Sequence, residues 1–99
     1  MNYEQALEAI KNNFPSVVEN HSVGVAAEMI ANTTYYNKVV VWEKDGEVFA
    51  CRLSKDTTMS VKAEMWSGGM ITSSRFSVGM WYPEKDLVIM SHEHVVIDL

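Results

Sequence analysis

The apolar residues near the start of the chain recur every three or four positions, which is the period of a helix with one buried face. They are Tyr3, Leu7, Ile10 and Phe14. Pro15 ends this run, and Asn2 followed by Gln5 is typical of a capping box at a helix start. The pattern therefore predicts a helix over residues 3–13.

A second run at helical spacing predicts another helix over residues 22–32. Ser22 is the expected N-cap and Asn32 the expected C-terminal signal, whereas Gly24 weakens the helical pattern. One face of this helix would carry Val23, Ala26, Ala27 and Ile30.

The pattern becomes strand-like from Lys38 onward. Two β-rich runs flank Asp45-Gly46, a dipeptide typical of a type I′ hairpin turn, and this turn pairs Trp42 with Phe49 and Val40 with Cys51. Both faces of the hairpin are apolar near its centre. We therefore expect it to be covered on both faces or to lie at a subunit interface.

A second hairpin is predicted from Met59 to Trp66 and back from Met70, with the three-residue turn Ser67-Gly68-Gly69 between its strands. The apolar positions of the returning strand later change parity, which predicts one inserted residue, a bulge near Ser73-Ser74.

Residues 83–86 are predicted to form a turn, and residues 87–99 one long strand or two short ones bent at Ser91-His92. The whole chain, residues 1–99, then forms one α+β domain, helical to about residue 33 and sheet-forming from about residue 34. We expect the two N-terminal helices to pack on one face of an antiparallel meander of about five strands.

Composition narrows the classes of function. The net charge is −5 and the eight Lys and Arg residues are scattered, so nucleic acid and anionic membranes are not expected partners. No apolar run approaches the ~20 residues of a membrane helix and the start does not resemble a signal peptide, which predicts a cytoplasmic protein. A chain of this size leaves little room for a large active-site cleft.

Candidate catalytic or metal-binding groups are few. His92 and His94 would project to one side of a strand, with Asp98 at the same parity, but a closed zinc site needs four ligands and nothing in the sequence places His21 beside them. Two solvated histidines are the favoured interpretation. Cys51 shares its face with apolar residues, so we expect a buried, inert thiol, no cofactor and no enzyme activity.

The chain is rich in large, soft and aromatic side chains, with seven Met, three Trp and four Tyr. Some of them must leave the helix-facing core, because consecutive strand residues point to opposite faces. Such residues are enriched in protein-binding surfaces. The candidate partner-binding residues are Tyr35, Tyr36, Trp66, Met70, Met80, Trp81 and Tyr82. A second small core on the far side of the sheet is an equally weighted alternative.

These observations predict a small interaction module that binds a protein partner, or associates with itself as a homodimer, as inhibitors, immunity proteins and mobile-element accessory factors do. The alternative is a binder of a nucleotide-like ligand or a metal. Such a site would hold the ligand with Trp or Tyr rings and with His92 and His94. A homodimer interface is one place where the site could form. An enzyme using those histidines is the weakest third class.

Overall fold

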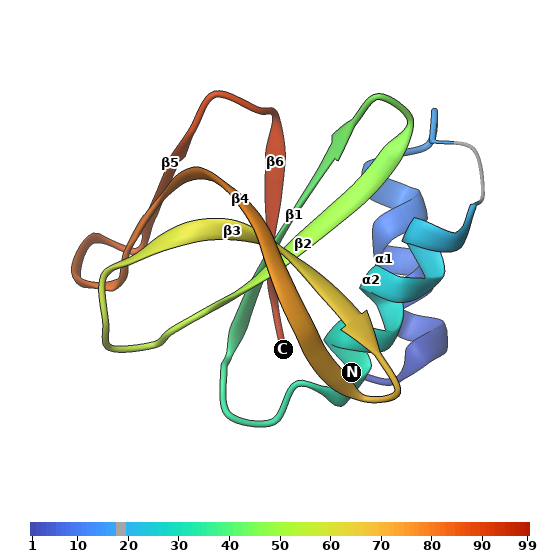
Figure 1. The fold of residues 1–99 in the computed structure, drawn as a ribbon, viewed down its shortest axis with the longest axis horizontal. Coiled ribbons are helices and arrows are strands. Elements are labelled where there is room, and N and C mark those ends of the chain that lie inside the picture. The colour runs from blue at the N-terminus through green and yellow to red at the C-terminus, as the bar shows by residue number, and fades with distance from the viewer. Residues whose placement is uncertain (18–19) are drawn as a thin grey trace.

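The computed structural model describes residues 1–17 and 20–99 and confirms the α+β class (Figure 1). Its helices and strands are α1 (Tyr3–Asn13), α2 (His21–Asn32), β1 (Lys38–Lys44), β2 (Glu47–Leu53), β3 (Met59–Ser67), β4 (Met70–Tyr82), the 3-10 helix η1 (Pro83–Lys85), β5 (Leu87–Met90) and β6 (His94–Asp98). Within the described residues, no helix has the length and apolar character needed to cross a membrane.

The first helix begins as predicted. Asn2 Oδ1 accepts from the Gln5 N–H at 2.8 Å, and Gln5 Oε1 accepts from the Asn2 N–H at 2.9 Å, which completes the capping box. The second helix starts one residue earlier than expected, and its N-cap is Asn20 rather than Ser22. Asn20 Oδ1 accepts from both the Ser22 N–H and the Ser22 hydroxyl, and the oxygen of that hydroxyl in turn accepts from the Val48 N–H.

The strands form two antiparallel sheets instead of one meander, with the orders β2-β1-β6 and β3-β4-β5. The predicted register of the first hairpin is confirmed, including Trp42 opposite Phe49 and Val40 opposite Cys51. The segment after η1 divides into two short strands, as one alternative allowed. β5 pairs with β4 and β6 pairs with β1, so the bend at Ser91-His92 carries the chain from one sheet to the other.

Strand β1 lies at the centre of a three-layer arrangement. On one face of the first sheet, Val39 and Val41 pack with the two helices. On the other face, Val40 and Trp42 pack with apolar residues of the second sheet. The hairpin is therefore covered on both faces within one chain, and the second small core considered above is present.

The second hairpin differs from the prediction in its turn and in its bulges. Ser67 pairs directly with Met70, so the turn has two residues, Gly68 and Gly69, with positive φ of 60° and 80°. Three register shifts replace the single bulge predicted near Ser73-Ser74. The sequence pattern did not reveal the shift between Ser77 and Gly79, because Phe76, Val78, Met80 and Tyr82 keep a single alternation across it.

Candidate functional site

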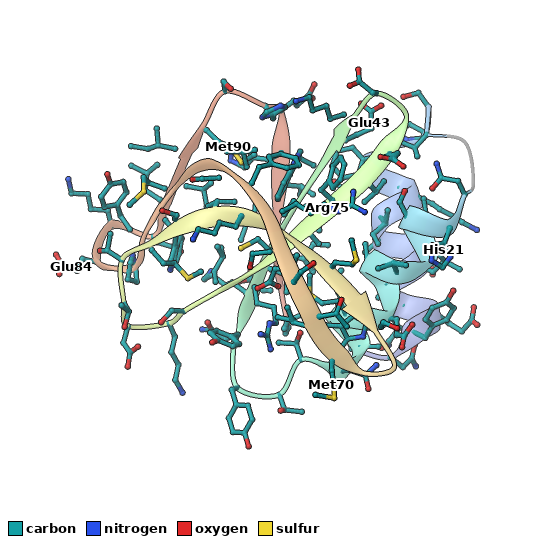
Figure 2. All side chains as sticks on the ribbon, viewed as in Figure 1. His21, Glu43, Met70, Arg75, Glu84 and Met90 are labelled. Atoms are coloured by element: carbon teal, nitrogen blue, oxygen red, sulfur yellow. The ribbon has the colours of Figure 1, made fainter. Side chains whose placement is uncertain are left out.

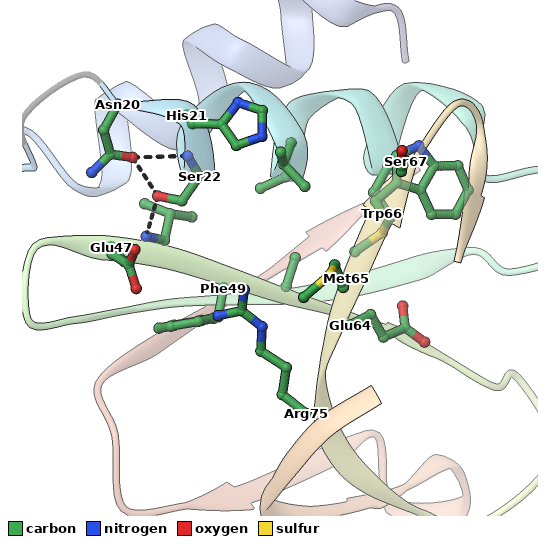
Figure 3. A pocket seen from close by; sticks show the side chains of 15 residues that line it. Asn20, His21, Ser22, Glu47, Phe49, Glu64, Met65, Trp66, Ser67 and Arg75 are labelled. Atoms are coloured by element: carbon green, nitrogen blue, oxygen red, sulfur yellow. Dashed lines mark hydrogen bonds between the residues drawn. The ribbon is translucent and has the colours of Figure 1, made fainter. Parts of the chain in front are cut away.

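A half-open groove of about 470 Å³ lies between α2, strand β2 and the second hairpin (Figure 3). Its size is within the range of small-ligand sites and exceeds what chain length led us to expect. The lining residues are Asn20, His21, Ser22, Val25, Ala26, Met29, Glu47, Val48, Phe49, Ala50, Glu64, Met65, Trp66, Ser67 and Arg75. The groove therefore has apolar walls and a polar, charged rim.

The outer edge of β2 opens onto this groove. Successive residues of an antiparallel strand point their N–H and C=O groups alternately toward the paired strand and away from it. The N–H of Val48 donates to Ser22 Oγ at 3.0 Å and the N–H of Arg52 to Glu64 Oε2 at 3.3 Å, so both point away from β1. Ala50 lies midway and lines the groove, and alternation places its N–H and C=O on the same outer edge. β2 is the terminal strand of its sheet, so no strand of the described chain pairs with this edge.

A partly buried ion pair joins Arg52 of β2 to Glu64 of β3, and Glu64 lines the groove. Arg52 Nε lies 3.5 Å from Glu64 Oε2. The guanidinium lies 4.9 Å from the centre of the Tyr36 ring and 5.8 Å from that of Trp66. Burial raises the pKa of the Glu64 carboxyl, and the contacts with Arg52 oppose that shift. Arg52 and Glu64 therefore lie beside both the Trp66 ring and the β2 edge.

The raised pKa of Glu64 predicts a pH-dependent stability. The folded chain holds a proton on Glu64 at a pH where the unfolded chain has lost it, so the stability from this group is greatest at low pH. The free energy of unfolding of the wild-type chain minus that of Glu64→Gln should therefore fall as the pH rises from about 4, the ordinary range of a glutamate, toward neutrality. Urea unfolding across that range measures it, and a constant difference would contradict the assignment.

Two charged side chains at the rim of the groove, Arg75 and Glu47, form no ion pair with any described residue. The Arg75 guanidinium lies 5.9 Å from the centre of the Phe49 ring, and Figure 3 shows its side chain extending toward that ring at the groove. Glu47, at the start of β2, is exposed on the same side of the strand as Phe49. Ion pairs among the described residues involve Lys38 and Arg52 instead.

The predicted partner-binding residues differ in exposure and do not form one surface. Trp66 and Trp81 are only 6% and 2% exposed and belong to the two cores, so neither indole is available as a surface anchor. Tyr35 is 83% exposed, and Met70 is 69% exposed and extends from the hairpin tip (Figure 2). Tyr36 is half-buried against Arg52.

Two of the predicted residues, Met80 and Tyr82, are half-buried and lie opposite Ile89 and Leu87 on neighbouring strands of the second sheet. Ile89 is 54% exposed. Of all the predicted residues, only Trp66 lines the groove.

The two histidines do not share a strand, as the metal hypothesis required. His92 lies in the bend before β6, and its carbonyl oxygen is 3.0 Å from His94 Nδ1. Within residues 1–17 and 20–99, no three His, Cys, Asp or Glu side chains gather as metal ligands would. The predicted burial of Cys51 is confirmed, and burial raises the pKa of its thiol to about 12.

Comparison with protein-family models, curated proteins and solved structures finds no match. The sequence pattern missed the other fourteen lining residues, including Ser22, Ala50, Glu64 and Arg75. They carry no common motif, because the groove depends on the approach of segments that are distant in the sequence. The Ser22–Val48 contact spans 26 residues.

Proposed function

We propose that the protein is a non-catalytic cytoplasmic interaction module that binds an extended segment of a partner protein in the groove beside β2. The observation that carries this proposal is the unpaired edge of β2 at Ala50, which opens into a groove with apolar walls. Main-chain groups on a free sheet edge bind an added strand, and flanking pockets select its side chains.

The groove suits a short extended segment. A strand residue rises about 3.3 Å, so three residues span about 10 Å. Side chains alternate between the two sides of a strand, and here one side is formed by Val25 and Met29 of α2 and the other by Phe49. The bonds from Ser22 and Glu64 occupy the neighbouring N–H groups, which limits pairing to the stretch around Ala50.

A compact ligand is the second class of occupant to consider, because a groove of this size also fits a small molecule. The nucleotide-like variant was expected to use several Trp or Tyr rings together with His92 and His94. Trp66 is the one member of that set among the described groove residues. The extended segment is favoured because it uses the β2 edge.

Filling the groove should weaken peptide binding. We expect Val25→Trp to place an indole against Met29 and to weaken, by at least about tenfold, the binding of peptides selected from a random displayed library. Fluorescence polarisation measures the affinity, and the shift of the Ala50 amide in a ¹H–¹⁵N spectrum locates the peptide.

Asn32→Trp is the matched control, because Asn32 is exposed at the end of the same helix and does not line the groove. Equal binding by the wild-type chain and both variants would contradict the proposal. Sedimentation of the wild-type chain tests the other predicted partner, a second copy of itself.

A further inference from the structure

Arg75 lines the groove and forms no ion pair with the described residues. It is the one Lys or Arg side chain among the described residues of the groove. It reaches the groove from β4, and its guanidinium lies over the Phe49 ring. Phe49 is itself held by Trp42, at 5.9 Å between ring centres, and by Phe76, at 5.7 Å. A guanidinium held over a fixed ring loses less freedom when it binds an anion.

The carboxylates near Arg75 leave it available to a ligand. Glu64 forms an ion pair with the Arg52 guanidinium and also accepts a hydrogen bond from the Arg52 backbone N–H. Glu47 lies on the same side of β2 as Phe49 but forms no ion pair with Arg75. A binding partner can therefore supply the carboxylate that Arg75 lacks, with bidentate geometry.

Strand pairing fixes where that carboxylate belongs. Residues directly opposite each other on paired strands project to the same face. The partner residue opposite Ala50 therefore points toward α2, where Val25 and Met29 favour a small apolar side chain. The residues before and after it point to the other face, toward Phe49 and Arg75.

We infer that the partner segment has an apolar residue opposite Ala50 and an acidic residue next to it, whose carboxylate binds Arg75. This inference rests on the proposed function, because it requires the segment to pair with β2. A charge-assisted contact of this kind corresponds to a preference of about tenfold for an acidic over a basic residue. The preference weakens as salt screens the rim.

Three blocked pentapeptides test the inference. Each has a central valine flanked on both sides by aspartate, asparagine or lysine. With the wild-type chain, the aspartate peptide should bind about tenfold more tightly than the lysine peptide. Arg75→Glu should reverse that order. Lys44→Glu is the matched control, because it makes the same charge change at a cation that lies 5.5 Å from the Phe76 ring and outside the groove lining.

The outcomes separate the two proposals. The inference is supported if Lys44→Glu keeps the wild-type order while Arg75→Glu inverts it. It is overturned if the three peptides bind equally well, or if both variants change the order alike, even though each peptide shifts the Ala50 amide. In that case the proposed groove function stands. If no peptide shifts the Ala50 amide, both the groove function and the charge preference fail.

Discussion

Replacing Trp81 with alanine is expected to lower the free energy of unfolding by about 3–5 kcal/mol. The indole is 2% exposed and packs between the two sheets, against Val40 and Leu53 among others. Its Nε1–H also donates to the carbonyl oxygen of Ser54. Truncation therefore removes a large apolar volume and leaves that carbonyl without its donor. Urea unfolding followed by circular dichroism measures the loss.

Trp81→Phe is the control for this substitution. It keeps an aromatic ring in the core but removes the hydrogen bond to Ser54, so we expect a clearly smaller loss than for alanine. A change below about 1 kcal/mol in Trp81→Ala would show that the indole is not a core residue. The surface-anchor interpretation from the sequence would then be restored.

Gly79→Ala is expected to destabilise the chain by about 2–3 kcal/mol through overpacking. A Cβ at this position would lie 2.4 Å from the Ile89 carbonyl oxygen and 2.6 Å from Met90 Cβ, so β4 and β5 would have to separate. Denaturant unfolding measures the effect.

Gly24→Ala is the matched substitution in α2. Its added Cβ would have one neighbour, Tyr3 Oη at 3.4 Å, and alanine in a helix is more stable than glycine by about 0.5–1 kcal/mol. We therefore expect Gly24→Ala to stabilise the chain while Gly79→Ala destabilises it. If the two variants changed stability in the same direction, the claim that β5 lies too close to Gly79 to admit a Cβ would be contradicted.

The elements with local signals could be predicted from the sequence. The capping box at Asn2 and the Asp45-Gly46 turn each depend on residues a few positions apart, and both are confirmed. The division of the strands between two sheets could not be predicted, because β5 and β6 are both short and apolar. Only the tertiary pairing of β6 with β1 distinguishes them.

The groove was missed for a related physical reason. Alternation along a strand shows that Met80, Trp81 and Tyr82 cannot all face one core, but it does not show which layer covers the other face. Both faces of the first sheet are covered, so the tryptophans became core residues. The hydrophilic partners of the β2 edge, Ser22 and Glu64, have no sequence pattern that links them to Ala50.

The central position of β1 has a consequence for how fast the chain folds. Its pairing with β2 needs only the Asp45-Gly46 turn, so the hairpin can form within microseconds. Its other edge must wait for β6, and the contact of Lys38 Nζ with Asp98 joins residues 60 positions apart. The conformational entropy lost in closing so long a loop is not offset until β6 has paired with β1, and this slows folding. Until β6 arrives, one edge of β1, which contains the apolar run 39–42, stays open to pairing with another chain.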